Sequence, residues 1–330
     1  MSKIFFKNKT ILITGGTGSF GQALVNFLLK NKFPLKKIVI LSRDEFKQYE
    51  MKKKFSKIKN ANIRYLIGDI RDKDRIKLAI NDVDILIHAA ALKQVPSAEY
   101  NPFEYIKTNI IGSQNILEAC LDSKISNVLA LSTDKASSPI NLYGGTKLCS
   151  DKLFVSGNFI KGTRNIKFSV VRYGNVMGSR GSVLENFIEQ KKSGYLLITD
   201  KRMTRFSIGL SQAVDFVINS LIRSKGGEIF IPKIPSFLIY NLAKAVCSSC
   251  KIKFIGIRTG EKIHEEMISE NESLQTIDLN DCYAIINQNL LKSYKKKFFL
   301  QKFSYRSDNN HHFLTIDELR KIVKTFLIKH

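Results

Sequence analysis

The chain has 330 residues, of which 44% are hydrophobic, so it can hold one large domain or two ordinary ones around a sizeable core. Its formal net charge is +24, but the lysines are dispersed and form no stripe of the kind that reads nucleic acid. No apolar run reaches the ~18 residues needed to cross a bilayer, and five cysteines without framework spacing favour free thiols in the cytoplasm. We therefore expect a globular cytoplasmic protein without a nucleic-acid or membrane partner.

The first element predicted along the chain is a strand over Thr10 to Thr14, followed by the turn G-G-T-G-S-F-G and an apolar-periodic helix over Ala23 to Leu29. Strand, glycine turn and helix form the context that a dinucleotide fingerprint requires. Gly15, Gly18 and Gly21 have the spacing G-x-x-G-x-x-G, which lets the backbone approach a pyrophosphate at the helix N-terminus. The alternative is an ordinary glycine-rich turn.

A second apolar run, Ile38 to Leu41, ends in Ser42, Arg43 and Asp44, about twenty residues after the fingerprint. An acidic residue at this place favours NAD, whereas a basic residue accommodates the 2'-phosphate of NADP. Both are present. Arg43 with Ser42 beside it suits a phosphate, so the sequence favours NADP.

Two further strands follow. The third covers Ile63 to Ile67 and precedes a helix over Arg71 to Ile80. The fourth ends in the small residues Ala89 to Ala91, against which a cofactor can lie, and Lys93 follows at the expected substrate crevice. His88, inside this strand, is interpreted as a packed core histidine.

Strands also end at Leu131 and in K-F-S-V-V-R-Y-G-N-V-M-G, so six strands alternate with helices in residues 1–178. This rhythm is typical of an α/β, Rossmann-type doubly wound parallel sheet with its site at the carboxyl ends of the strands. The rhythm breaks in residues 179–330, where we expect a smaller C-terminal substrate-binding cap rather than more sheet. The segments assigned to it are Tyr195 to Thr199, Ser211 to Arg223, Glu228 to Ile231 and Lys253 to Ile257.

The stretch from Ser132 to Lys147, S-T-D-K-A-S-S-P-I-N-L-Y-G-G-T-K, carries the groups able to move a proton. Tyr143 and Lys147 are four residues apart and share one face of a helix. The Lys147 ammonium is expected to lower the pKa of the Tyr143 phenol, so that Tyr143 can act as a general base. Ser132 and Thr133 stand at the end of the preceding strand.

This Tyr-x-x-x-Lys pair with an upstream hydroxyl, together with the glycine fingerprint, resembles the extended short-chain dehydrogenase/reductases. Asp134 and Lys135, directly after the hydroxyls, resemble those of the inverting UDP-N-acetylglucosamine 4,6-dehydratases of the pseudaminic-acid pathway, in the polysaccharide biosynthesis protein family. The resemblance runs from about Lys9 to about Met267. It implies NADP, a UDP-N-acetylglucosamine substrate, a homo-oligomer and, because retaining relatives have Asp-Glu here, inversion at C5.

The resemblance also implies the site residues. The cofactor would be held by Gly15, Thr17, Gly18, Ser19, Phe20, Gly21, Ser42, Arg43, Asp44, Asp69, Ile70, Ala89, Ala90, Ala91, Asn109, Tyr143 and Lys147. The nucleotide sugar would contact Lys93, Tyr173, Asn175, Arg205, Arg258 and Glu261. For Asp69 a second interpretation stays open, a cap for the helix that follows.

The implied reaction is oxidation at C4, loss of water from C6 and reduction at C6. Thr133 would orient the hydroxyl and Tyr143 would take its proton. We expect Lys135 to remove the C5 hydrogen and Asp134 to protonate the departing C6 hydroxyl. Lys135 is expected to be nearly neutral, because other cations such as Lys147 crowd the site. The product would enter synthesis of pseudaminic acid, which decorates surface structures such as flagellin.

Other functions remain open from the sequence. A nucleotide-sugar 4-epimerase, a 4,6-dehydratase for another deoxysugar and a non-catalytic NADP sensor would each keep part of the motif set. The basic, aromatic segment Leu290 to Arg306 could bind single-stranded nucleic acid, although an edge element or oligomer contact is favoured. Cys247 with Cys250, and His264 with its acidic neighbours, lack the further ligands of a metal site, so we expect no metal.

Overall fold

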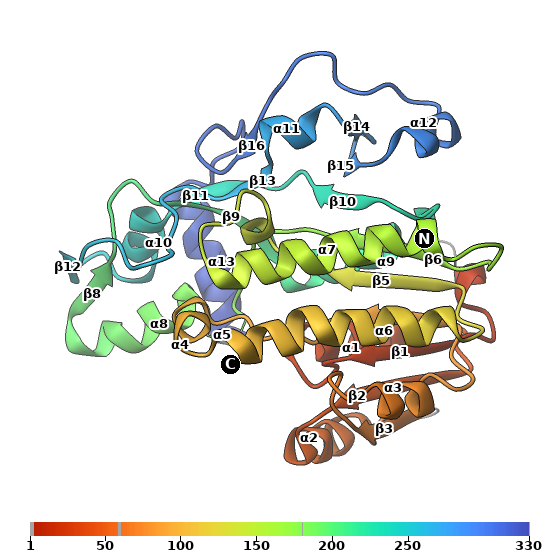
Figure 1. Cartoon of the computed structure of the whole chain (residues 1–330). Coiled ribbons are helices and arrows are strands. Elements are labelled where there is room, and N and C mark those ends of the chain that lie inside the picture. Colours follow the sequence, from red (N-terminus) through yellow and green to blue (C-terminus); the bar gives the residue numbers. More distant parts are fainter. Residues whose placement is uncertain (1–2, 59–60, 180, 330) are drawn as a thin grey trace.

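A nine-stranded sheet runs through the centre of the protein, with helices on both faces (Figure 1). The structure is a computed structural model that describes residues 3–58, 61–179 and 181–329. In spatial order the strands are β3 (Ile63–Ile67), β2 (Lys37–Ser42), β1 (Thr10–Thr14), β4 (Ile85–His88), β5 (Asn127–Leu131), β6 (Lys167–Val171), β10 (Ile229–Pro232), β15 (Cys282–Ile285) and β14 (Thr276–Asp278).

The first seven strands in this order are parallel, and β15 and β14 are antiparallel to their neighbours. The order β3-β2-β1-β4-β5-β6 is that of a doubly wound dinucleotide-binding sheet, whose ligands bind beyond the carboxyl ends of the strands. The predicted Rossmann-type sheet is therefore confirmed.

Helices cover the two faces of the sheet because successive strand residues point to opposite sides. Leu12 of β1 belongs to the hydrophobic cluster on one face, whereas its neighbours Ile11 and Ile13 belong to the cluster on the other. One face carries α3 (Lys73–Ala79), α6 (Gly112–Leu121) and α7 (Leu142–Ile160). The opposite face carries α1 (Ser19–Lys30), α2 (Glu45–Phe55) and α9 (Leu210–Arg223).

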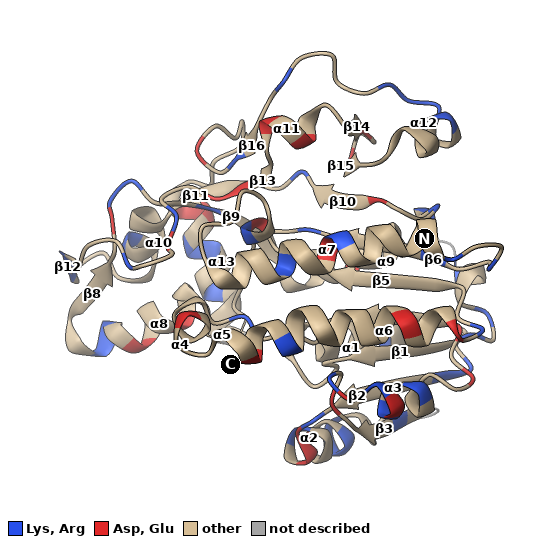
Figure 2. Ribbon diagram, viewed as in Figure 1, with Lys and Arg blue, Asp and Glu red and all other residues tan. Residues whose placement is uncertain are grey.

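The positive charge is spread over many elements and does not gather on one of them (Figure 2). Lys and Arg occur on α2, α3, α7, α8 and the loops at the top of the view, interspersed with acidic residues. None of the helices in the described residues is long and apolar enough to cross a membrane.

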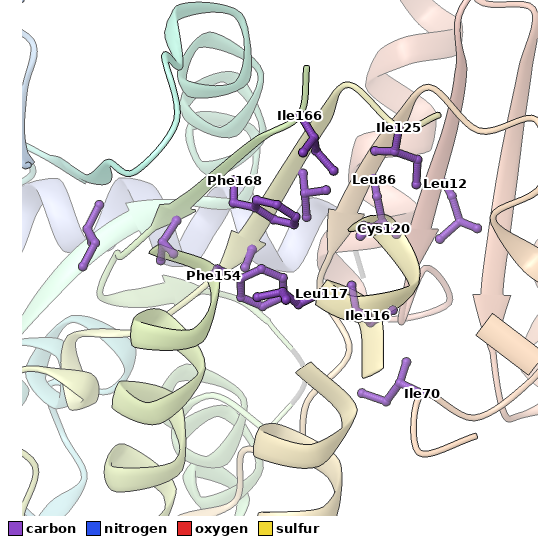
Figure 3. Packing of buried hydrophobic residues seen from close by; sticks show 14 of the residues in the cluster. Leu12, Ile70, Leu86, Ile116, Leu117, Cys120, Ile125, Phe154, Ile166 and Phe168 are labelled. Atoms are coloured by element: carbon purple, nitrogen blue, oxygen red, sulfur yellow. The ribbon is translucent and has the colours of Figure 1, made fainter. Parts of the chain in front are cut away.

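The core beneath α6 and α7 is formed by apolar side chains that interlock with the sheet (Figure 3). Phe154 of α7 and Leu117 of α6 lie against Phe168 of β6, and Phe154 and Phe168 are fully buried. Burial of a large apolar side chain stabilises a fold by roughly 1.5 to 3 kcal/mol. This packing fixes α7, and with it the stretch that carries Tyr143 and Lys147.

A smaller lobe lies at one end of the sheet (Figure 1). Its elements are α8 (Val183–Gln190), α10 (Ile239–Val246) and α13 (Ile316–Lys329), the parallel pair β8 (Tyr195–Ile198) and β12 (Lys251–Phe254), and the three-stranded sheet β7 (Asn175–Met177), β9 (Thr204–Gly209) and β11 (Ser236–Leu238). They share a hydrophobic cluster that includes Leu184, Leu196, Phe237, Leu242 and Leu319.

The remaining elements are short. They are the 3-10 turns Lys3–Phe6, Asp134–Ala136 and Lys191–Ser193, α4 (Val95–Tyr100), α5 (Pro102–Tyr105), a π-helix (Ile106–Ile111), α11 (Glu270–Ser273), α12 (Gln288–Tyr294), and the antiparallel pair β13 (Glu266–Ile268) and β16 (Tyr305–Arg306).

Three expectations about the second half of the chain are wrong. Glu228 to Ile231 is expected in the cap, but this run forms β10, which pairs with β6 and carries β15 and β14 into the main sheet. Ser211 to Arg223 is also expected in the cap, but it lies in α9, whose apolar face packs on the main sheet. Cys247 and Cys250 were expected to be free, but they form a disulfide, because the bend between α10 and β12 brings their Cα atoms to 5.5 Å.

The expected edge element in Leu290 to Arg306 is confirmed. Its aromatic rings at Phe299 and Phe303 pack against Tyr283 of β15. The Phe299 amide donates to the carbonyl of Thr276 in the edge strand β14, at 3.3 Å. The aromatic residues of this segment therefore cover the end of the sheet.

Candidate active site

A cavity of about 540 Å³ opens at the carboxyl ends of β1, β2, β4, β5 and β6. The sequence-predicted residues that line it are Gly15, Thr17, Gly18, Ser19, Phe20, Gly21, Ser42, Arg43, Asp44, Asp69, Ile70, Ala89, Ala90, Ala91, Lys93, Thr133, Asp134, Lys135, Tyr143, Lys147, Tyr173 and Asn175. The structure thus brings together side chains from six separate predicted motifs.

The floor of the cavity is bare backbone. Gly15 has φ +64°, and a Cβ at this position would lie 2.8 Å from the Cα of Ala90. A Cβ on Gly21 would lie 2.3 Å from the carbonyl oxygen of Gly16, where α1 meets the preceding turn. The cavity reaches the N-terminus of α1, whose N-cap residue Gly18 has no side chain to bind the helix amides. This shape and these donors fit a dinucleotide pyrophosphate.

At the far end of the cavity, Asp44 is engaged as the N-cap of α2. Its carboxylate accepts the Lys47 amide at 2.9 Å and lies 2.6 Å from the Lys47 ammonium. These hydrogen bonds to Lys47 lower the pKa of Asp44. Arg43 lies beside it, half-exposed, with its guanidinium 3.7 Å from Asp69. Arg43 is therefore more available than Asp44 to contact a ligand at this end of the cavity.

Asp69 is not a helix cap. The N-cap of α3 is Asp72, whose carboxylate accepts the amide of Arg75 at 2.9 Å. Asp69 instead accepts from the backbone and side chain of Arg71 and lines the cavity.

Tyr143 and Lys147 lie on one face of α7, as predicted. The Lys147 ammonium donates to the backbone carbonyl of Leu131 at 2.8 Å. The expected lowering of the Tyr143 pKa is not found: burial raises it to about 12, against the opposing effects of Lys135 and a hydrogen bond with Thr133. The physical reason is that the whole phenol is removed from water, which penalises the tyrosinate.

The turn Asp134–Ala136 holds the other predicted pair against the tyrosine. Asp134 is buried, and its Oδ1 accepts from the Thr133 hydroxyl at 2.9 Å and from the Lys135 ammonium at 3.1 Å. The turn packs closely on α7, since a Cβ on Gly144 would lie 2.3 Å from the carbonyl oxygen of Lys135. An acid, a base and the tyrosine therefore share one wall.

Sequence reasoning missed Glu265, which completes this wall. Its Oε1 lies 3.0 Å from the Lys135 ammonium and 3.5 Å from Nε of Arg205, and its side chain is 2% exposed. Glu265 lies more than a hundred residues from its partner Lys135, and its local pattern, next to His264, is only that of an incomplete metal site, so no signal in the sequence could place it here.

Glu265 overturns the expectation of a nearly neutral Lys135. Burial alone would lower the pKa of Lys135, but the carboxylates of Asp134 and Glu265 raise it well above its usual range. The two carboxylates themselves differ. Burial and the neighbouring Glu265 raise the pKa of Asp134. Burial would also raise the pKa of Glu265, but Lys135 and Arg205 outweigh it and lower that pKa. Asp134 thus suits an acid and Glu265 an anion.

A second cavity of about 220 Å³ shares Lys135 and Asn175 with the first. It is lined by Asn141, Met203, Arg205, Arg258, Glu261, Lys262 and Glu265. The Arg205 guanidinium donates to the carbonyls of Thr204, Lys262 and Ile263, so it holds the loop that forms this cavity. Arg258 is exposed at the cavity, where its guanidinium suits an anionic group.

Residues 11–287 match the family described as polysaccharide biosynthesis protein. The chain belongs to this family. It is 52% identical to a protein of Campylobacter jejuni (strain 81-176) named UDP-N-acetylglucosamine 4,6-dehydratase (inverting), over 96% of this chain and 98% of the relative. It is also 44% identical to a Rickettsia bellii protein named UDP-glucose 4-epimerase, over 89% of this chain and 87% of the relative. Among solved structures, Pen from Bacillus thuringiensis matches with a TM-score of 0.91 and 38% identity, over 98% and 99% of the two chains.

In this polysaccharide biosynthesis protein, two predicted residues support the site from behind it. His88 is a buried core histidine, as predicted, whose Nδ1 lies 2.8 Å from the hydroxyl of Thr14. Asn109 was assigned to the cofactor but is absent from the lining of the cavity. Its amide binds the backbone of Leu92 and the hydroxyl of Thr146, and so fixes the segment after Ala91 to α7.

A buried charge network behind Lys147 also escaped sequence reasoning. Arg172, fully buried at the end of β6, contacts Asp151 of α7 at 3.3 Å and Glu272 at 3.0 Å. It also donates to the carbonyl of Met267. Asp151 is four residues beyond Lys147, and its charge opposes the lowering of the Lys147 pKa by burial. The network ties the helix of the predicted tyrosine and lysine to the later segment that carries Glu265.

Proposed function

We propose that this chain is an NADP-dependent, inverting UDP-N-acetylglucosamine 4,6-dehydratase, a hydro-lyase. The observation that carries the proposal is the pair Asp134 and Lys135 in one cavity wall with Thr133 and Tyr143. Oxidation of a hydroxyl needs only the tyrosine, the hydroxyl and Lys147, whereas elimination of water needs an additional acid and base. The similarity to the Campylobacter jejuni protein supports the same activity.

The roles follow from the contacts. Thr133 orients the C4 hydroxyl. Tyr143 takes its proton as the tyrosinate, the form that Lys135 and the hydrogen bond with Thr133 favour against burial. When bound, NADP would accept a hydride from C4 and later return it to C6, and a proton would re-enter C5 from the opposite face, which inverts that carbon. The 4-ketone acidifies the C5 hydrogen, which Lys135 removes. Asp134, whose pKa is raised by burial and by the neighbouring Glu265, gives a proton to the departing C6 hydroxyl.

NADP is favoured over NAD by the adenosine end of the cavity. Asp44, the acidic residue that would read a ribose 2'-hydroxyl, is already bound to Lys47, and Arg43 stands beside it at the cavity. A guanidinium and an ammonium next to Ser42 suit a 2'-phosphate.

The nucleotide sugar would enter through the second cavity, built mainly from residues 179–330. Arg258 would bind the diphosphate and Glu261 the ribose hydroxyls, with Lys93, Tyr173 and Asn175 toward the sugar. Arg205 would act by shaping the loop. The product, UDP-2-acetamido-2,6-dideoxy-β-L-arabino-hex-4-ulose, would begin pseudaminic-acid-type synthesis in the cytoplasm, in a homo-oligomer.

A 4-epimerase is the second candidate, because the Rickettsia bellii relative bears that name. Epimerisation would use Thr133, Tyr143 and Lys147, and would leave Asp134 and Lys135 without a task. The buried acid beside a buried ammonium therefore favours dehydration.

The test is incubation of the protein and NADP with UDP-N-acetylglucosamine in deuterated water. We expect loss of one water by mass spectrometry, and proton NMR should show deuterium at C5 with changed ring couplings. An isomer of unchanged mass would contradict the proposal and favour the epimerase.

A further inference from the structure

The carboxylate of Glu265 occupies a central place in the charge cluster between the two cavities. Its Oε1 contacts the Lys135 ammonium at 3.0 Å and Arg205 at 3.5 Å. Its Oε2 is buried and has no hydrogen-bond partner among the described residues. A buried carboxylate oxygen without a partner is costly, so a functional reason for it is required.

The fold holds Glu265 in place through its backbone. The Glu265 amide donates to the hydroxyl of Ser307 at 2.9 Å, and the Ser307 amide donates to the Glu265 carbonyl at 2.8 Å. The Ser307 hydroxyl in turn lies 2.7 Å from that of Thr204. Two segments distant in the sequence therefore position this one carboxylate.

The proposed elimination leaves Lys135 with a chemical difficulty. Its raised pKa means that it is an ammonium, which has no lone pair to accept the C5 hydrogen. Its two carboxylate contacts are Asp134 and Glu265. Asp134 must arrive with its own proton to release water, so it cannot also take the proton of Lys135.

Glu265 can accept that proton. At rest the ion pair is the favoured form, since the pKa of Lys135 is raised and that of Glu265 is lowered. Burial removes the solvation of both charges, which lowers the free-energy cost of passing the proton across the 3.0 Å contact during the reaction. The charged groups that act on Glu265 are Lys135, Arg205 and Lys262, and the charge of Glu265 in turn raises the pKa of Asp134. Entry of a substrate into the cavity would strengthen this effect by removing the remaining water.

We propose that Glu265 is a positioning residue that takes one proton from Lys135 and so creates the amine that removes the C5 hydrogen. The proposal rests on the proposed dehydratase function. The Nζ–H bond of Lys135 breaks and an O–H bond forms on Glu265. Lys135 then takes the C5 proton, the C5–H electron pair forms the C5–C6 double bond, and the C6–O pair leaves with the proton of Asp134 as water. Lys135 ends as an ammonium, Glu265 as an acid and Asp134 as a carboxylate.

The first test needs no substrate and uses the full chain labelled with ε-¹³C lysine. The Lys135 resonance is identified by its loss in Lys135→Arg. In Glu265→Gln the pKa of Lys135 should fall, because one of two carboxylates is removed. Glu266→Gln is the matched control, since the Glu266 side chain accepts from Ser137 and Ser138 and makes no contact with Lys135. A Lys135 pKa unchanged in Glu265→Gln overturns the proposal.

The second test separates the two halves of the reaction. In Glu265→Gln, deuterium incorporation at C5 should fall by about 10² to 10⁴, the usual contribution of a general base, while the initial oxidation at C4 keeps its rate. Glu265→Asp, which keeps the carboxyl and covers the case in which the glutamine variant does not fold, should recover part of the exchange. Equal losses in both steps, or exchange at the normal rate, would refute a proton-holding role. A wild-type protein that releases no water refutes the dehydratase, and the lysine titration still reports on Glu265.

Discussion

The two cavities of this protein are shaped by different kinds of chemical group. The larger one is shaped by backbone, glycines and alanines at the ends of β1 and β4, where an added Cβ would collide with the opposite strand. The smaller one is shaped by charged side chains, among them Arg205, Glu261 and Glu265, which hold one another and the loop around them. Under the proposed function, a cofactor that returns unchanged would meet a rigid surface, whereas the reacting sugar would meet groups that can exchange protons.

The difference predicts how each region fails. Changes in the glycine floor of the larger cavity act through volume, while changes in the charged region leave buried groups unpaired or remove a proton. Substitutions with matched controls test this difference between the two cavities.

The largest effect is expected for Asp134→Asn. The amide cannot donate the proton that releases water, so dehydration should fall by about 10² to 10⁴. Affinity for NADP should be unchanged, because the glycine floor is intact. Product formation by mass spectrometry and cofactor titration measure the two quantities. Retained dehydration would remove the acid from the proposed mechanism.

Arg172→Met should destabilise the fold by about 3 to 5 kcal/mol, because the buried Asp151 and the largely buried Glu272 would lose their cation. Arg202→Met, which removes an exposed arginine paired with Asp200, should leave the unfolding midpoint almost unchanged.

The contact between Arg172 and Glu272 also gives a pH test, which is measured by denaturant unfolding. Burial would raise the pKa of Glu272, but Arg172 lowers it below its usual 4.5. The stabilisation from this contact is therefore fully present above the usual pKa of 4.5 and is lost as the pH falls through the lowered pKa of the folded state. The difference in the free energy of unfolding between wild type and Arg172→Met should become smaller on acidification. A difference that grows would contradict the assignment.

Gly144→Ala should cost about 1 to 3 kcal/mol and lower activity, because the new methyl group would displace the carbonyl of Lys135. Gly145→Ala is the control one residue along α7. Nothing lies within 4 Å of its Cβ position, so it should stabilise the helix by about 0.5 to 1 kcal/mol. Thermal unfolding compares the two, and equal effects would show that the turn does not pack as described.

The smallest effect is expected at the adenosine end. Arg43→Ala should reduce the preference for NADP over NAD roughly tenfold, the loss of about one charge-assisted hydrogen bond. Asp44→Ala should weaken the start of α2 without changing the preference, since its carboxylate is used as a helix cap. Affinities for both cofactors decide between them. A loss of NADP preference in Asp44→Ala alone would reverse the assignment.

The same contrast explains what the sequence could predict. The strand over Thr10 to Thr14, the glycine turn and the pair Tyr143 and Lys147 are local patterns, and the structure reproduces them. The pairing of β10 with β6 depends on segments distant in the chain, so periodicity could not reveal it. The ionisation of Lys135 was mispredicted for the same reason: Glu265 reaches it only through the folded arrangement.

The hydrogen bonds between Ser307 and Glu265 have a consequence for how the protein matures during translation. The glycine floor uses only early residues, whereas the carboxylate beside Lys135 gains its anchor only after Ser307 has been added to the chain. A chain that ends before Ser307 would therefore keep every residue of the floor and lose the anchor of Glu265.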